Sequence, residues 1–270
     1  MKINRFFYPC IGALFSVNAL ADCSVHDDLG TPKADQLLCH GGYLTGYSNV
    51  NKSPAWVAYY FTRKNVYARL PAIQHLYRSD DSIPPEFRTY SNDYTDTGYD
   101  RGQLAPSSVS SFMNDAAQET FLMSNIVPQL PSFNRDSYPH AGAWAALEEM
   151  EQQQVLRRGD INVIAGPVYT KPVQYMNKGI PIPSHFFKVL YSPKLLAVAA
   201  FLVPHSGSSG EPISSYLTSV DCVESLTGLD LLSALPDDIE NDIENKRAIS
   251  LKYWSMRDGY SKPTISCKFK

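Results

Sequence analysis

The sequence predicts an α+β protein, because segments typical of strands and helices follow one another without the regular alternation of a doubly wound parallel sheet. Apolar residues recur at helical spacing over 143–158, and Gly159 follows that stretch as glycine often does at a helix end. A second helix is expected over 214–228. Strands are expected where aromatic, β-branched and other apolar residues form short runs, at 56–61, 119–127, 161–166, 186–191 and 195–203.

Composition and charge limit the class of protein. The chain has 270 residues, of which 44% are apolar and 19% charged, and no repeat, low-complexity tract or linker interrupts residues 22–270. We therefore expect a single domain over 22–270. The formal net charge is −3. This charge argues against a protein that only coats nucleic acid, because phosphate neutralisation favours a basic surface. A local basic cleft is compatible with it.

The first 21 residues have the pattern of a secretory signal peptide. Lys2 and Arg5 precede an apolar run over 6–17, which is too short to span a membrane, and small residues end the segment at Ala21. We expect the mature protein to be exported, either periplasmic or secreted, with no membrane partner.

Cysteine usage agrees with export. Four cysteines remain after residue 21, and an even number in an oxidising compartment predicts two disulfides. We favour the pairs Cys23–Cys39 and Cys222–Cys267, because each pair closes a nearby loop. The alternative is that these are free, buried thiols.

Three segments carry side chains suited to catalysis. They cover 100–106, which reads Asp-Arg-Gly-Gln-Leu-Ala-Pro, then 122–129 and 133–148. Amide and carboxylate oxygens in these segments suit a hard cation such as Mg²⁺ or Mn²⁺, whereas no Cys/His cluster has zinc spacing. Exposed functional groups usually lie on loops and helix starts of a rigid scaffold. The candidates at such positions are Arg101, Asn125, Asn134, His140 and Glu148.

The order and spacing of these segments resemble the DNA/RNA non-specific endonucleases, the Serratia-type nucleases with the ββα-metal (His-Me finger) fold. Supporting matches lie at 53–60, 166–169, 183–188 and 228–238. The resemblance implies a central antiparallel sheet flanked by helices. It also implies a Mg²⁺-dependent enzyme that hydrolyses the phosphodiester bonds of DNA and RNA to 5′-phosphorylated products.

The chain departs from the family pattern at its central residue. The family motif begins Asp-Arg-Gly-His, and its histidine is the general base that activates water, but Gln103 occupies that position here. A neutral amide does not accept a proton usefully. Either the protein is an inactive relative that binds nucleic acid or a protein partner, or another residue supplies the base.

An inserted segment offers a replacement imidazole. In the family, a metal-binding asparagine lies nine residues after the position of Asn125 and four before that of Trp144. The first count reaches Asn134 and the second reaches His140, so the chain carries an insertion of six residues. Our hypothesis is that Asn134 holds the cation and His140 is the base. The alternative places His140 itself on the metal.

The remaining roles are carried over from the family by position. Arg101 would stabilise charge on the phosphate in the transition state, and Gln103 would position water or substrate. Glu148 would orient a metal-bound water or aid proton transfer. Asp100 and Asn125 are assigned to substrate binding, and bracing of the loop is a second reading for Asn125.

The family also leads us to expect an arginine in the loop before the motif. Arg69 and Arg78 are the arginines available in that loop. Local spacing instead brings His75 nearest to the expected position, so the sequence leaves this role unassigned.

Overall fold

The structure is a computed structural model, and the signal-like segment 1–21 lies outside the residues that it describes. The described residues are 23–24, 27–68, 76–110, 114–136, 141–206, 211–244, 254 and 267.

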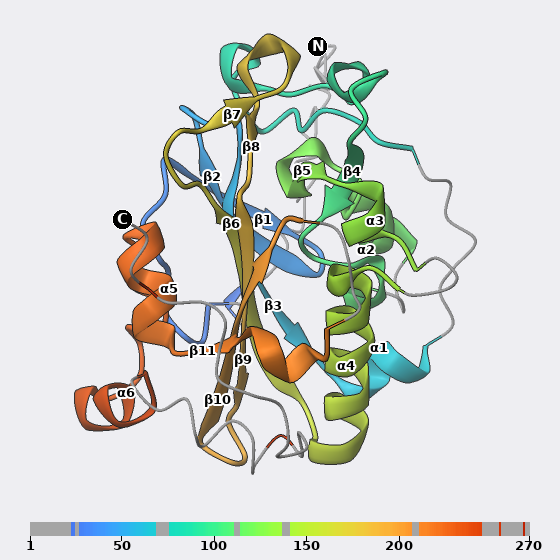
Figure 1. The fold of residues 1–270 in the computed structure, drawn as a ribbon. Helices are drawn as coiled ribbons and strands as arrows, with labels where there is room; N and C mark the ends of the chain where they lie inside the picture. The colour runs from blue at the N-terminus through green and yellow to red at the C-terminus, as the bar shows by residue number, and fades with distance from the viewer. Residues whose placement is uncertain are drawn as a thin grey trace, which may run out of the picture.

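A seven-stranded sheet forms the centre of the molecule (Figure 1). Its strand order is β1-β2-β3-β6-β9-β10-β11, and every neighbouring pair is antiparallel. The predicted α+β class with a central antiparallel sheet is therefore confirmed. The strands are β1 (Gln36–His40), β2 (Tyr43–Ser48), β3 (Ser53–Phe61), β6 (Ile161–Val168), β9 (His185–Ser192), β10 (Ala197–Pro204) and β11 (Leu217–Thr218).

Both faces of this sheet are buried, so its strands read as continuous apolar runs rather than as alternating ones. Successive side chains point to opposite faces. Tyr59 and Val163 belong to a hydrophobic core on one side, whereas their neighbours Ala58 and Ile164 belong to a second core on the other side. Each core needs its own covering layer of helices.

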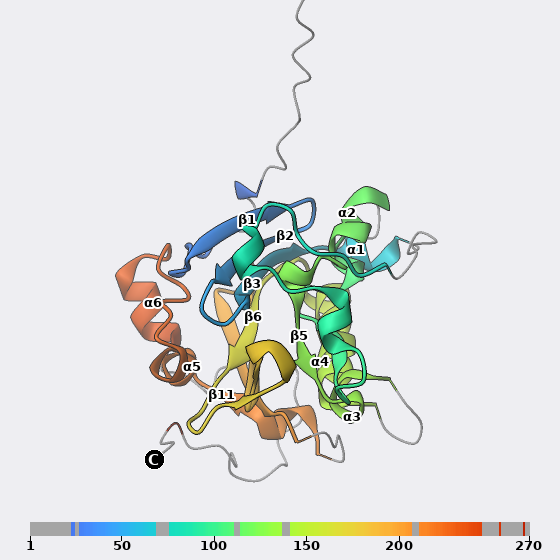
Figure 2. The ribbon, with the colours of Figure 1, turned by 90° about the horizontal axis from the view of Figure 1, so that it is seen from above.

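Helices cover the two faces from opposite sides (Figures 1 and 2). The helix α4 (Ala143–Arg158) buries Trp144, Leu147 and Val155 in the first core and ends at Gly159, whose φ of 107° suits glycine. It has the predicted bounds. On the other face, α5 (Val220–Thr227) and α6 (Asp237–Glu244) contribute to the second core.

Two predicted elements differ from the structure. The helix expected over 214–228 begins only at Val220, because Leu217–Thr218 pairs with β10 and the Ser219 side chain caps the helix by accepting from the Cys222 amide. The strand expected over 119–127 is shorter and later, since β5 covers Ile126–Gln129. It pairs with β4 (Asp100–Gln103) in a separate two-stranded ribbon.

The remaining elements are short. They are α1 (Arg63–Tyr67), α2 (Asn114–Glu119), α3 (Pro131–Asn134), β7 (Gln174–Tyr175), β8 (Pro181–Ile182), and the 3-10 turns η2 (Pro85–Phe87), η3 (Ser91–Tyr94), η4 (Ser107–Ser110), η5 (Met123–Asn125), η6 (Asn177–Gly179) and η7 (Ile213–Tyr216).

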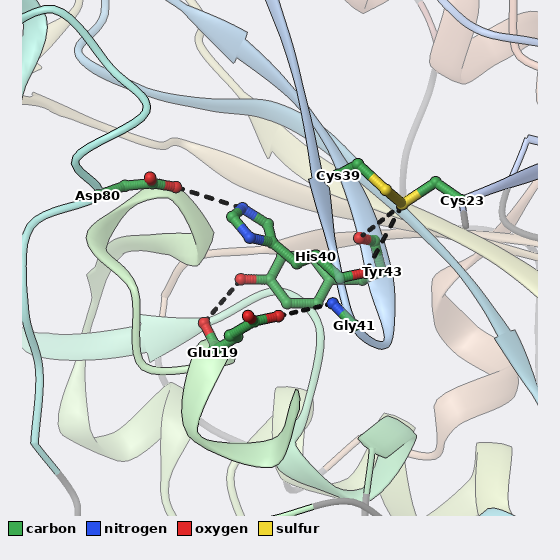
Figure 3. Close-up of a disulfide and its surroundings, with 7 residues drawn as sticks. All are labelled: Cys23, Cys39, His40, Gly41, Tyr43, Asp80 and Glu119. Atoms are coloured by element: carbon green, nitrogen blue, oxygen red, sulfur yellow. Dashed lines mark hydrogen bonds and ion pairs between the residues drawn. A yellow bond between two sulfur atoms is a disulfide. The ribbon is translucent and has the colours of Figure 1, made fainter. Parts of the chain in front are cut away.

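Both predicted disulfides are present. Cys23 is bonded to Cys39, with 5.8 Å between their Cα atoms, and Cys222 to Cys267, with 5.3 Å. Figure 3 shows the first of these bonds at the end of β1, next to His40. Within the described ranges, no helix has the length and apolar character that crossing a membrane requires.

Candidate active site

The β4–β5 ribbon divides the Asp-Arg-Gly-Gln motif between two faces. Asp100 pairs with Gln129 and Gly102 with Val127, and strand geometry places alternate side chains on opposite faces. Arg101 and Gln103 therefore share one face. The motif glycine has a packing reason, because a Cβ atom at Gly102 would lie 2.2 Å from the Gln129 side chain.

Arg101 is held without an acidic partner. Its Nε and Nη2 donate to the carbonyl oxygen of Ser91 at 2.9 and 2.5 Å, and its guanidinium lies 5.6 and 5.9 Å from the ring centres of Tyr77 and Tyr94. The salt bridges formed among the described residues do not include Arg101. Its guanidinium is therefore oriented without a direct ion pair among the described residues, although the nearby Asp100 carboxylate interacts with its charge. This arrangement suits contact with a phosphate.

Gln103 anchors the ribbon to its surroundings. Its side-chain nitrogen donates to the carbonyl oxygen of Thr120 at 2.8 Å and to its hydroxyl at 3.0 Å. The main-chain oxygen of Gln103 accepts from the Trp144 indole at 3.1 Å, which ties β4 to the start of α4. The amide thus occupies the family's histidine position in a fixed orientation but supplies no group that takes up a proton.

Asp100 and Asn134 meet on the opposite face. The Asn134 side chain donates to Asp100 Oδ2 at 3.1 Å, and Arg135 donates to both carboxylate oxygens at 2.8 and 2.6 Å. Partial burial raises the pKa of Asp100, but hydrogen bonds from Arg135 and Asn134 outweigh it and leave the pKa below its usual value. The structure therefore brings Asn134 to Asp100, while Arg101 points to the other face.

Asn125 is enclosed behind the ribbon. Its side chain is fully buried, donates to the carbonyl oxygens of Ala105 and Thr120 at 2.9 and 2.8 Å, and accepts from the Ala105 amide at 2.9 Å. All of its amide donors and its acceptor are used within the protein. This placement favours the bracing role over direct contact with substrate.

Glu148 lies one turn after Trp144 on α4 and is half-buried. Burial raises its pKa to about 7, an effect that Lys188 opposes and Glu151 reinforces. A carboxyl group with this pKa exchanges protons near neutrality, as a residue that aids proton transfer must. Directly beneath it, Lys188 and Glu151 form a fully buried ion pair at 2.8 Å.

The raised pKa of Glu148 predicts a specific pH dependence of stability. Between pH 4.5 and about 7 the folded protein retains a proton that the unfolded chain releases, so the free energy of unfolding falls as pH rises through this window. Glu148→Gln should remove this fall. The free energy of unfolding of the variant, relative to that of wild type, should therefore be about 1–3 kcal/mol higher at pH 8 than at pH 4. Urea unfolding at both pH values measures it. The exposed neighbour variant Glu149→Gln should show no such gain.

His140 lies outside the described residues, as do Arg69 and His75. The two ends of the inserted segment are visible. The Gly142 amide donates to the carbonyl oxygen of Arg135 at 2.8 Å, and a Cβ atom at Gly142 would lie 2.1 Å from the Phe133 oxygen. Glycine is therefore required where the insertion rejoins the helix.

Arg78 lies beside the ribbon. Its main chain bridges to Leu122, donating to the Phe121 oxygen at 3.2 Å and accepting from the Met123 amide at 2.9 Å. The preceding residue, Tyr77, donates its hydroxyl to the Arg101 carbonyl at 3.3 Å. Arg78 is exposed. Of the three residues considered for the expected arginine, it is the one within the described part of the chain, and it lies close to the motif.

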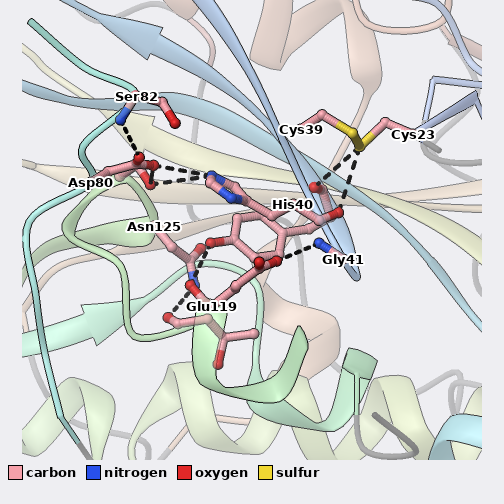
Figure 4. A network of polar contacts seen from close by, with 11 residues as sticks. Cys23, Cys39, His40, Gly41, Asp80, Ser82, Glu119 and Asn125 are labelled. Atoms are coloured by element: carbon pink, nitrogen blue, oxygen red, sulfur yellow. Dashed lines mark hydrogen bonds and ion pairs between the residues drawn. A yellow bond between two sulfur atoms is a disulfide. The ribbon is translucent and has the colours of Figure 1, made fainter. Parts of the chain in front are cut away.

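A buried network around Asp80, two residues after Arg78, was not predicted from the sequence (Figure 4). His40 Nε2 lies 3.2 Å from Asp80 Oδ2, to which the Ser124 hydroxyl donates at 2.6 Å. The Ser82 amide donates to Asp80 Oδ1 at 2.9 Å. These contacts attach the 76–82 segment to β1 and η5. In the sequence, the predicted disulfide of Cys39 drew attention to the residue next to His40, but no pattern pointed to Asp80.

The Asn134 amide oxygen fits a divalent cation of the hard class, because its side-chain nitrogen, and not this oxygen, is used on Asp100. Both Asp100 oxygens already accept from Arg135, so this carboxylate is paired within the protein. A separate acidic group in the described part of the chain, Asp221 with Glu224 and Glu244, lies on α5 and α6. Those helices cover the other face of the sheet, so this group does not belong to the ribbon site.

An antiparallel two-stranded ribbon followed by a helix is the arrangement of the ββα-metal nucleases. A model of the family described as DNA/RNA non-specific endonuclease matches residues 25–238. The chain belongs to this family, and its enzyme class is that of a nuclease, which hydrolyses phosphodiester bonds.

Individual relatives agree. Nuclease 1, mitochondrial, of Schizosaccharomyces pombe is 30% identical over 226 residues, covering 76% of this chain and 68% of the relative. The nuclease of Serratia marcescens is 28% identical over 271 residues, covering 92% and 97%. The human mitochondrial nuclease EXOG is 28% identical over 244 residues, and the match spans 83% of this chain but only 64% of the human protein.

A solved structure has the same fold. The crystal structure of the EndoG/EndoGI complex superimposes with a TM-score of 0.70 at 25% identity, covering 83% of this chain and 95% of that chain.

Proposed function

We propose that this protein is an exported, Mg²⁺-dependent endonuclease that hydrolyses both DNA and RNA and leaves 5′-phosphorylated products, with Mn²⁺ as a substitute metal. The observation that carries the proposal is the geometry of Arg101. Its guanidinium is fixed by the Ser91 oxygen and two aromatic rings, not by a carboxylate. A positive charge held in this way suits the phosphate charge that develops during hydrolysis.

Other residues would take part from both faces of the ribbon. Glu148, with a pKa of about 7, would transfer a proton, and the exposed Arg78 would add a second contact to the nucleic-acid backbone. Asn134 would hold the metal through its amide oxygen while its nitrogen stays on Asp100. When bound, the cation would neutralise the scissile phosphate.

The general base is the departure from the family. The Gln103 side chain donates to Thr120 and has no proton-accepting nitrogen, so we assign the base to His140 of the inserted segment. The competing assignment, His140 as a metal ligand, makes different predictions for the variants treated in the Discussion.

Export is supported by the signal-like segment 1–21 and by the two disulfides, which persist in oxidising compartments. Several relatives carry mitochondrial names, so the family serves more than one compartment. The pattern of residues 1–21, a positive start followed by a single apolar run, favours secretion or the periplasm.

Plasmid cleavage tests the enzymatic proposal directly. Purified protein should convert supercoiled plasmid to nicked and linear forms in Mg²⁺, should degrade RNA, and should lose both activities in EDTA. Arg101→Ala should lower the cleavage rate at least about 10²-fold, as loss of a transition-state charge contact does. Nucleic acid that is retarded in a gel but never cleaved would support the inactive, binding relative instead.

A further inference from the structure

A cavity of about 340 Å³ adjoins the nuclease ribbon and has no part in the roles described so far. We propose that it receives one unpaired nucleobase of the strand being cut, a proposal that rests on the proposed function. Residues that line the cavity include Tyr99, Leu130, Gln174, Ile182, Ser184 and His205.

The cavity adjoins the end of the ribbon where the motif begins on β4 and where β5 ends. Tyr99 directly precedes Asp100, and Leu130 directly follows Gln129, while Asp100 and Gln129 are paired across the ribbon. The opposite wall comes from the β7–β8 hairpin, which packs beside β5 (Figure 2). A nucleotide next to a phosphate bound at the ribbon would therefore have its base at this opening.

The lining carries no lysine, arginine, aspartate or glutamate. A phosphate or a metal ion would find no countercharge in it, so the occupant is expected to be neutral. Tyr99, Leu130 and Ile182 offer aromatic and apolar surface, as the face of a base requires. Gln174 offers a side-chain amide, which both donates and accepts. The Ser184 hydroxyl already donates to the Val168 oxygen at 3.0 Å and accepts from the Thr170 amide at 3.2 Å, so it shapes the wall. One amide that can either donate or accept adapts to different base edges, in keeping with a non-specific enzyme.

The wall at His205 is rigid and uncharged. Its Nδ1 hydrogen-bonds the Pro183 oxygen at 2.8 Å, and its Nε2 accepts from the Leu130 amide at 2.7 Å. Burial lowers the pKa of His205 to about 4, so the ring is neutral at working pH. Because both ring nitrogens are used, His205 shapes the cavity and attaches it to the start of α3.

The position of the cavity bears on the state of the substrate. A space of about 340 Å³ is at the lower end of small-molecule sites and has room for one base. A base in a duplex must leave the stack to enter, at a cost of a few kcal/mol. Single-stranded or locally opened nucleic acid is therefore the substrate that this cavity favours.

Moving a single abasic site along a labelled single-stranded DNA tests the inference. In wild type, one abasic position at a fixed distance from the cut bond should lower kcat/KM about tenfold, mostly through KM, because one stacked base contributes about 1–3 kcal/mol. Tyr99→Leu should lose this dip, which is the drop in kcat/KM at one abasic position. The variant should also cleave the intact strand with a kcat/KM about tenfold below that of wild type. Gln174→Ala should reduce the dip without disturbing packing, since Gln174 is exposed.

The matched control is Tyr175→Leu. Tyr175 neighbours Gln174 on β7 and is 61% exposed, but it does not line the cavity. This variant should keep the wild-type dip and the wild-type rate.

The outcomes separate the two proposals. Cleavage by wild type with a flat response to every abasic position would overturn the base-binding role and leave the nuclease proposal intact. If wild type fails to cleave, a strand carrying the fluorescent base 2-aminopurine tests the cavity in EDTA. Quenching that Tyr99→Leu loses and Tyr175→Leu keeps supports the cavity role, and quenching equal in all three proteins would refute it.

Discussion

His140→Ala is expected to lower kcat on DNA by about 10²–10⁴-fold, the usual contribution of a positioned general base. The reason is local. The Gln103 amide is committed to Thr120, and we assign the water-activating imidazole to the inserted segment. KM should change little. Initial rates on a defined oligonucleotide in saturating Mg²⁺ measure the effect, with thermal unfolding as a check that the variant is folded.

Two further variants distinguish a base from a metal ligand. Gln103→His restores the family's base at its usual position and should recover most of the activity lost in His140→Ala when the two are combined. His140→Asn supplies an amide oxygen but no proton acceptor, so it should be as inactive as His140→Ala. Activity close to wild type in His140→Asn, with a raised Mg²⁺ requirement in His140→Ala, would instead assign His140 to the metal. Full activity in His140→Ala would refute both assignments.

Lys188→Met is expected to lower the free energy of unfolding by about 3–5 kcal/mol, because it leaves a buried carboxylate without its countercharge. Lys188 is fully buried, donates to Glu151 at 2.8 Å, contacts the Tyr59 hydroxyl at 3.3 Å and lies 4.5 Å from the centre of the Trp144 ring. The second oxygen of Glu151 is buried without a hydrogen-bond partner among the described residues. Urea unfolding at pH 7 measures the loss.

The double variant Lys188→Met with Glu151→Leu should recover most of this stability, since an apolar pair of similar volume removes both charges. Lys194→Met, on an exposed turn, is the matched control and should stay within about 0.5 kcal/mol of wild type. A double variant as unstable as Lys188→Met alone would show that packing, and not charge pairing, is what Lys188 provides.

Local pattern predicted the long helix and the strands β3, β6, β9 and β10, and the order of the cysteines predicted both disulfides, since each joins two cysteines that follow one another in the sequence. The antiparallel arrangement of the sheet came from the family resemblance. The partners of the site residues were not predictable in this way. Gln103 meets Thr120 and Asn134 meets Asp100, and these contacts depend on how the ribbon folds over neighbouring turns. Lys188 is a charged residue in a strand that is buried on both faces. Its partner, Glu151 on α4, is 37 residues away in the sequence, so only the structure reveals the pair.

The hydrogen bond between the Arg135 oxygen and the Gly142 amide has a consequence for how such chains vary. This bond holds the two ends of the segment together at a fixed distance. Changes in the length of chain between them therefore need not shift α3 or α4, since each doubling of loop length costs only about 0.6 kcal/mol. This protein therefore has, at the rim of its active site, a place where segment length can change while the scaffold stays fixed.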